Sequence, residues 1–258
     1  MKIAILYICT GKYSTFWEDF YNSSQKYFLN GIEKHYFVFT DDINIVNSED
    51  VTKVYKEYLG YPYDTLNRFE TFWKIKETLL LYDYTIFFNA NLVFIDEVNT
   101  ECLPSISDGG LMALIHPSFY SSPARFFPFE RNKKSTSYIP YKKQKYTYYM
   151  GSLNGGITIM YLDLIKECMD NVKKDNDNGI LALVLDESHL NRYLYDRKVL
   201  GLSPSYGYPE GYKIPFVKKI VMLNKVSIDS SFSIIPINQT IFDVFKIKFK
   251  RLYRILFW

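Results

Sequence analysis

The sequence lacks several features that would assign it to common functional classes. Its three cysteines, Cys9, Cys102 and Cys168, lie far apart without CxxC or CxxH spacing, so neither a disulfide framework nor a zinc site is predicted. No GxGxxG or GxxxxGK[ST] motif occurs, so neither a dinucleotide fingerprint nor a P-loop is predicted. No apolar run reaches the about 18 residues of a membrane-spanning helix, and the first ten residues lack a cleavage pattern. We therefore expect a cytoplasmic protein in a reducing compartment.

A surplus of basic over acidic residues is also absent outside one short segment. The chain has 31 Lys and Arg against 28 Asp and Glu. Five of these basic residues and one acid lie in residues 241–258, which leaves 26 basic residues against 27 acids elsewhere. A body without basic surplus is a poor candidate for nucleic-acid binding, which needs several phosphate-neutralising cations on one face.

The basic segment has the periodicity of an amphipathic helix. Apolar side chains recur at spacings of three and four, and cations lie on the other side. Residues 241–258 therefore predict a helix at an anionic membrane surface, which would place the protein peripherally on the inner face of the cytoplasmic membrane. The alternative is a helix packed back on the core. We expect one domain over residues 1–225 and a C-terminal extension over 226–258.

The remaining sequence is long enough for a substantial core and alternates strand and helix patterns. Apolar runs predict strands at residues 3–9, 36–40, 51–58, 111–116 and 157–161. Helical spacing is found at residues 16–28, 69–82 and 162–174. This alternation predicts an α/β fold with a central, mostly parallel sheet.

The stretch over residues 84–96, YTIFFNANLVFID, is the centre of this prediction. Two apolar runs, typical of a buried central strand and its continuation, enclose Asn89, Ala90 and Asn91. Open α/β sheets bind ligands beyond the carboxyl ends of their strands, so this polar pair is well placed to contact one. A simple turn is the alternative, because Asn tolerates left-handed backbone.

Two later segments also indicate a site. Gly155 and Gly156 precede the predicted strand 157–161 and would allow close backbone approach to a ligand, or make a bulge. Asp186 and Glu187 follow an apolar run at the head of a predicted helix. Helix capping explains one acid, whereas two acids suit a site in which one faces a developing cation and the other orients a sugar hydroxyl.

Six segments in series resemble one family. FFNAN, HPSFY, SYIP, YYMGSLNGG, LDESHLNRY and LSPSYGYPEG, in this order, are similar to the histo-blood-group A/B and α-1,3-galactosyltransferase family, glycosyltransferase family six, and especially to its bacterial members. The similarity covers residues 2–225. It implies a Rossmann-like GT-A fold and a retaining transfer of galactose or N-acetylgalactosamine from UDP to a galactosyl acceptor.

The resemblance also implies roles for individual residues. Glu187 matches the carboxylate under the anomeric carbon, and Asp186 its neighbour on the donor-sugar hydroxyls. Arg68 matches a donor-sugar contact, and His116 an acceptor-galactose contact. Lys225 and Lys12 are candidates for the charge on departing UDP. The residues that match the uracil pocket are Ile8, Cys9, Thr10 and Tyr13.

The metal site of animal relatives is altered. Those enzymes hold a divalent cation with an Asp-any-Asp motif, whereas this chain has Asn89 and Asn91, as in bacterial relatives that work without metal. Neutral amides are poor ligands for Mg²⁺ or Mn²⁺. We expect no metal cofactor, and UDP-Gal or UDP-GalNAc as donor.

Specificity is expected to differ from the animal enzymes. Met150 and Ser152 match the two positions that separate GalNAc from Gal donors, and their bulk favours galactose. Val184-Leu185 replaces a Trp-His pair, and Pro128 replaces a hydroxyl residue, so the acceptor should differ from the blood-group H sugar. Three alternatives stay open: a non-catalytic UDP-sugar or glycan-binding member, a metal-dependent transferase with other ligands, and a membrane-interaction protein without chemistry.

Overall fold

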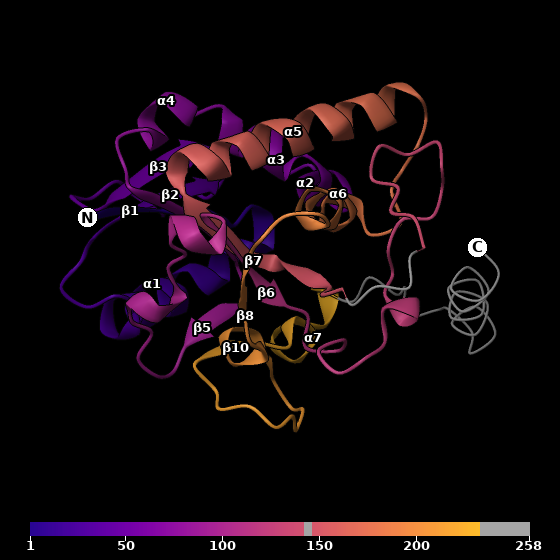
Figure 1. Ribbon diagram of the computed structural model, residues 1–258. Helices are drawn as coiled ribbons and strands as arrows, with labels where there is room; N and C mark the ends of the chain where they lie inside the picture. The colour runs from indigo at the N-terminus through magenta and orange to yellow at the C-terminus, as the bar shows by residue number, and fades with distance from the viewer. Residues whose placement is uncertain (142–145, 233–258) are drawn as a thin grey trace.

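The computed structural model describes residues 1–141 and 146–232 (Figure 1). The predicted amphipathic helix at 241–258 lies outside the described residues, so its membrane role stays a prediction. Within the described part of the chain, no helix combines the length and apolarity that crossing a membrane requires.

The main sheet has seven strands in the order β3-β2-β1-β4-β7-β6-β8. Only β7 runs antiparallel to its neighbours, and β4 occupies the centre, as the apolar run before Asn89 predicts. The α/β fold with a mostly parallel sheet is therefore confirmed. The strands are β1 (Lys2–Ile8), β2 (Glu33–Thr40), β3 (Val51–Tyr55), β4 (Tyr84–Asn89), β6 (Leu111–Ile115), β7 (Tyr149–Ile157) and β8 (Leu200–Leu202).

A smaller sheet lies beside the main one. It has the order β5-β10-β9, with β10 antiparallel to β5 and parallel to β9. Its strands are β5 (Leu92–Phe94), β9 (Tyr208–Pro209) and β10 (Ile220–Met222).

Helices cover both faces of the main sheet. In Figure 1, α3, α4 and α5 lie above the sheet, and α1 lies below it with the small sheet. The helices are α1 (Trp17–Tyr27), α2 (Tyr63–Leu66), α3 (Arg68–Trp73), α4 (Lys76–Leu79), α5 (Thr158–Asp177), α6 (Leu185–Leu194) and α7 (Lys225–Ile228). Short 3₁₀ turns are η1 (Gly11–Phe16), η2 (Thr100–Cys102), η3 (Ile106–Asp108), η4 (Ala124–Phe126), η5 (Pro204–Gly207) and η6 (Ser230–Phe232).

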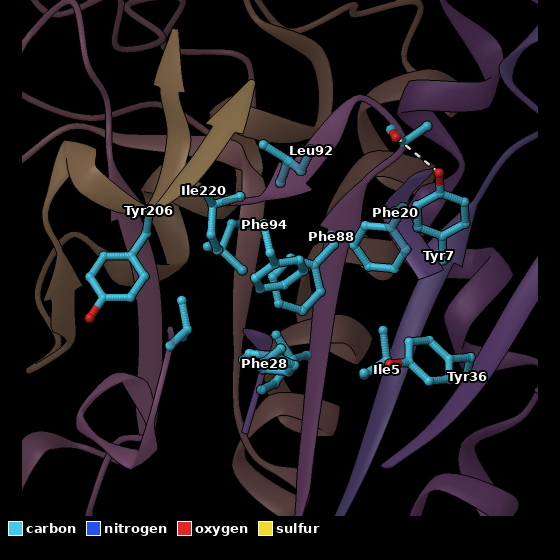
Figure 2. Close-up of a cluster of buried hydrophobic side chains, with 14 of the residues drawn as sticks. Ile5, Tyr7, Phe20, Phe28, Tyr36, Phe88, Leu92, Phe94, Tyr206 and Ile220 are labelled. Atoms are coloured by element: carbon cyan, nitrogen blue, oxygen red, sulfur yellow. Dashed lines mark hydrogen bonds between the residues drawn. The ribbon is translucent and has the colours of Figure 1, made fainter. Parts of the chain in front are cut away.

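The core is split by the sheet because side chains alternate along each strand. In β1, Ile3 and Ile5 pack with the cluster under α1, whereas Ala4 and Leu6 pack with the cluster under α5. Figure 2 shows the first cluster, where Phe28 and Phe94 lie 5.1 Å apart between ring centroids. Burial on both faces explains why the strands are continuous apolar runs rather than alternating ones.

The glycine pair corrects one sequence prediction. The strand predicted over 157–161 is instead β7, which ends at Ile157, and α5 begins at Thr158. Gly155 and Gly156 lie inside β7. A Cβ on Gly155 would stand 2.5 Å from the Thr85 carbonyl oxygen, and one on Gly156 would stand 2.2 Å from that of Gly110. The glycines therefore allow close backbone packing in the sheet. The helix predicted over 69–82 is also divided, into α3 and α4.

The strand directions gather chemically important residues at one edge of the sheet. The carboxyl ends of β1, β4 and β6 lead to Thr10, Asn89 and His116. Since β7 runs the opposite way, its first residues lie at this same edge, where Tyr149 pairs with Ile115 and Met150 with Leu114. The sheet thus brings segments far apart in sequence to one rim.

Candidate active site

The two acids stand at the first turn of α6. The residue before them, Leu185, has a φ of 48°, a left-handed conformation that is rare for a side chain of this size and is found at functional sites. Asp186 and Glu187 follow directly and share the positive end of the ten-residue helix. The sequence predicted this position correctly, but their partners come from elsewhere in the chain.

Glu187 has a donor on each carboxylate oxygen. The Tyr148 hydroxyl donates to Oε1 over 2.6 Å, and the Gly151 backbone N–H donates to Oε2 over 2.6 Å. Burial raises the pKa of Glu187 to about 7, while both hydrogen bonds and the nearby Arg68 oppose that rise. A carboxylate poised at neutral pH and fixed at both oxygens has the properties of a catalytic group.

Asp186 is paired with Arg68 from α3. The Arg68 Nη1 lies 2.7 Å from Asp186 Oδ2 and also donates to the Gly151 carbonyl oxygen over 2.7 Å. The guanidinium carbon lies 4.3 Å from the centre of the Phe87 ring. Burial raises the pKa of Asp186, and the charge of Arg68 opposes this effect. Arg68 therefore contacts Asp186 of α6, Gly151 of β7 and Phe87 of β4 at the same time.

The two amides at the rim are joined by one hydrogen bond. Asn89 donates from Nδ2 to Asn91 Oδ1 over 2.8 Å, and Asn91 Nδ2 donates to the Leu223 carbonyl oxygen over 2.7 Å. Neither residue brings an anionic oxygen, and the Asn91 side-chain oxygen is already occupied. Two neutral amides therefore do not fit Mg²⁺ or Mn²⁺, which favour anionic oxygens in a compact octahedral shell. Ala90 between them accepts a hydrogen bond at its carbonyl oxygen from Tyr7 over 2.9 Å, drawn in Figure 2.

The predicted uracil pocket lies at the end of β1. Ile8 pairs with Asn89 in the sheet. Cys9 is fully buried, its N–H donates to the Phe39 carbonyl oxygen, and its own carbonyl oxygen accepts from Thr40. Thr10 is buried and accepts at its carbonyl oxygen from the Tyr13 N–H over 3.1 Å.

Lys225 contacts Tyr13. Lys225 Nζ lies 3.4 Å from the Tyr13 hydroxyl and 5.1 Å from its ring centre. Burial and repulsion from Arg68 and Lys12 lower the pKa of Lys225. Lys12 donates to the Ser231 hydroxyl over 2.9 Å. Arg68, Lys12 and Lys225 therefore lie close enough for the first two charges to act on the third.

The two positions predicted to select the donor flank Gly151, the residue that contacts Glu187. Met150 is half-buried and packs on the core. Ser152 is buried, and its hydroxyl has no hydrogen-bond partner among the described residues. A buried hydroxyl without a partner is unusual in a folded protein and marks a place where a ligand could bond.

His116 lies beside Tyr148. The His116 backbone N–H donates to the Tyr148 carbonyl oxygen over 3.0 Å, and the centroids of the two rings lie 5.7 Å apart. Next to them opens a cleft of about 810 Å³, lined by both hydroxyl-bearing and aromatic side chains. Its lining residues are Ile115, Phe119, Tyr120, Ser121, Ser122, Pro123, Ala124, Arg125, Phe127, Tyr141, Tyr146, Thr147 and Tyr148.

Two site residues were missed by sequence reasoning. Tyr148 lies in the motif YYMGSLNGG, from which the sequence assigned it no role. Because Tyr149 follows directly, the sequence does not indicate which of the two tyrosines contacts Glu187. Asn191, one turn after Glu187, accepts from the Tyr149 N–H over 2.9 Å and donates to its carbonyl oxygen over 2.8 Å. The four-residue spacing from Glu187 was the available signal, since it places both side chains on one helix face.

Comparison with known proteins gives one family match and several relatives. The family description Glycosyltransferase family 6 matches residues 1–233. The O-antigen biosynthesis glycosyltransferase WbnI of Escherichia coli is 38% identical over 227 residues, which cover 87% of this chain and 95% of that protein.

Mammalian relatives are more distant and longer. The human globoside α-1,3-N-acetylgalactosaminyltransferase 1 is 27% identical over 241 residues, covering 90% of this chain and 68% of the human protein. The rat histo-blood group ABO system transferase 2 is 31% identical over 214 residues, covering 79% of this chain and 62% of that protein. With a GT-A-like sheet and a family match over nearly all described residues, the chain belongs to glycosyltransferase family 6.

Proposed function

We propose that this glycosyltransferase moves galactose, or N-acetylgalactosamine, from its UDP-sugar in α-1,3 linkage to a galactosyl acceptor, with retention at the anomeric carbon. The observation that supports this most is Glu187, a half-buried carboxylate with both oxygens fixed, next to the Arg68–Asp186 pair. The name of the Escherichia coli relative supports an acceptor in bacterial O-antigen synthesis. The galactosyl acceptor could carry fucose or lack it, which the panel below distinguishes.

Glu187 would act on the anomeric carbon. As the glycosidic bond to UDP breaks, positive charge develops on the sugar ring, and an ionised carboxylate beneath it stabilises that charge or attacks as a nucleophile. Asp186, held by Arg68, would accept hydrogen bonds from the sugar hydroxyls. The fixed positions of both acids would reduce the reorganisation needed during reaction.

Negative charge on departing UDP would be met by side chains. Burial lowers the pKa of Lys225, and repulsion from Arg68 and Lys12 lowers it further. A bound diphosphate would relieve that repulsion, which supports this cation group as its binding site. Because Asn89 and Asn91 do not fit a divalent cation, we propose that turnover requires no metal.

The acceptor would enter through the cleft beside His116. Aromatic rings and hydroxyls in one cleft suit a sugar, which presents apolar C–H faces and hydroxyl edges. Pro128 and Val184-Leu185 support an acceptor other than the blood-group H sugar. At the donor side, Met150 and Ser152 favour galactose because they leave less room for an N-acetyl group.

A donor and acceptor panel tests this proposal. Purified enzyme would be given UDP-Gal or UDP-GalNAc with fucosylated and unfucosylated galactosides, each with and without EDTA, and product linkage would be determined by NMR. We expect transfer in EDTA, and a loss of at least about a hundredfold in Glu187→Gln. Glu70→Gln, an exposed residue of α3, is the matched control and should retain activity.

The outcomes separate the alternatives. An undiminished rate in Glu187→Gln would refute the assigned role, and loss of turnover in EDTA would identify a metal-dependent enzyme. UDP-sugar binding by calorimetry without any product would identify a non-catalytic binding member.

We propose that the C-terminal extension begins near residue 225 and that its basic segment, residues 241–258, binds an anionic membrane surface. Sedimentation with vesicles containing anionic lipid should remove the full chain from solution and leave a chain ending at residue 232 behind. Equal sedimentation of the two would refute the membrane role, and loss of all activity in the shorter chain would favour a role in the fold.

A further inference from the structure

Tyr148 connects the cleft beside His116 to the proposed catalytic carboxylate. Tyr148 is one of the residues that line that cleft, and its hydroxyl donates to Glu187 Oε1 over 2.6 Å. The side chain is 1% exposed. Among the described residues, no other side chain is recorded donating a hydrogen bond to Glu187.

The hydroxyl is held in place from several sides. The Tyr148 ring lies 5.3 Å from Phe119 and 5.5 Å from Phe129 between centroids. Its carbonyl oxygen accepts the His116 N–H, and the following residue is bound through both backbone groups by Asn191 of α6. Since α6 also carries Glu187, the same helix fixes the donor and the acceptor of the hydrogen bond.

This bond favours the ionised form of Glu187. A phenol O–H donates to a carboxylate more strongly than to a neutral acid. The other groups acting on this carboxylate are the Gly151 N–H of β7, Arg68 of α3 and Asp186 of α6. Burial and Asp186 favour the protonated form, whereas the other three groups, including Tyr148, favour the charged form.

We propose that Tyr148 is a positioning residue for the transfer reaction, which holds Glu187 ionised and directed at the donor sugar through the hydroxyl bond. This inference rests on the proposed function, because it assumes that Glu187 reacts as a carboxylate. Tyr148 also lines the cleft proposed for the acceptor. Loss of its hydroxyl should change the pH dependence of the reaction.

The pH dependence of UDP release tests this role in Tyr148→Phe. We expect the midpoint of the acidic limb to move up by about one pH unit, since one hydrogen bond to a charged group is lost. The rate should fall about tenfold on the acidic limb and approach the unmodified enzyme's rate at high pH. Tyr195→Phe is the matched control, because that hydroxyl contacts Tyr146 and Pro140 rather than Glu187.

An isosteric variant covers the case in which Tyr148→Phe does not fold. Fluorotyrosine at position 148 has a more acidic phenol and donates more strongly, so the acidic limb should move down instead. Limbs that coincide with the unmodified enzyme's in both variants would overturn the proposal, as would an equal rate loss at all pH values. If Glu187→Gln leaves turnover unchanged, the proposed function fails; if it abolishes turnover and the limbs still coincide, only the role of Tyr148 fails.

Discussion

Arg68→Met should be among the most damaging single substitutions in this protein. The Arg68 and Asp186 side chains are 11% and 4% exposed, and their charged atoms lie 2.7 Å apart. Removing the guanidinium leaves a buried carboxylate without its counterion and leaves the Gly151 carbonyl oxygen without that donor. Breaking a buried pair in this way costs about 3–5 kcal/mol of unfolding free energy.

The second partner provides the internal test of that magnitude. Asp186→Asn in the Arg68→Met background removes the uncompensated charge while keeping the side-chain shape. The double variant should therefore recover about half or more of the lost stability, because replacing both charges of a buried pair is often nearly neutral. Urea unfolding followed by circular dichroism would measure the free energies of unfolding of the unmodified protein, Arg68→Met, Asp186→Asn and the double variant.

The pH dependence adds a sign to this prediction. Burial raises the pKa of Asp186 above its unfolded value, and loss of Arg68 removes the charge that opposes that rise. A carboxyl with a raised folded pKa destabilises the fold once the unfolded chain ionises, so the penalty is absent below the unfolded pKa, grows as pH rises from the unfolded pKa to the folded one, and is constant above that. The deficit of Arg68→Met should shrink at low pH. A loss below about 1 kcal/mol at neutral pH, or a larger deficit in acid, would contradict this reasoning.

Three further predictions follow from other parts of the structure. Because the pKa of Glu187 is about 7 and its ionised form is required, the rate of UDP release should rise with pH through about 7, and a flat profile from pH 5 to 9 would contradict this. Gly155→Ala should lose about 1–3 kcal/mol in urea unfolding because its Cβ meets rigid backbone, whereas Gly201→Ala, whose Cβ meets the side chains of Ile115 and Tyr149 and no backbone atom among its nearest neighbours, should lose less. Glu130→Gln should lose about 1–3 kcal/mol, because its buried carboxylate accepts the Asn132 and Leu183 N–H groups and a glutamine cannot accept both as well; stability equal to the unmodified protein would refute that role.

Much of the fold follows from local patterns in the sequence. The apolar runs of β1, β2, β4 and β6 predicted these strands, because sheets covered by helices on both faces bury nearly every strand residue. The polar break at Asn89 predicted the end of the central strand. Local patterns failed at β7, where the Gly155-Gly156 pair resembles a loop until the neighbouring strands are known to approach it closely.

The site divides in the same way. The sequence by itself determined that Asp186 and Glu187 begin a helix and that amides stand at the end of the central strand, because both features depend on adjacent residues. Only the tertiary structure decided that Arg68 pairs with Asp186 and that Tyr148, rather than Tyr149, reaches Glu187. Tyr148 immediately precedes β7 and Tyr149 begins it, so the alternation of strand side chains does not say which tyrosine reaches Glu187. Which of the two meets α6 is fixed by contacts across 39 residues of chain, which no local pattern encodes.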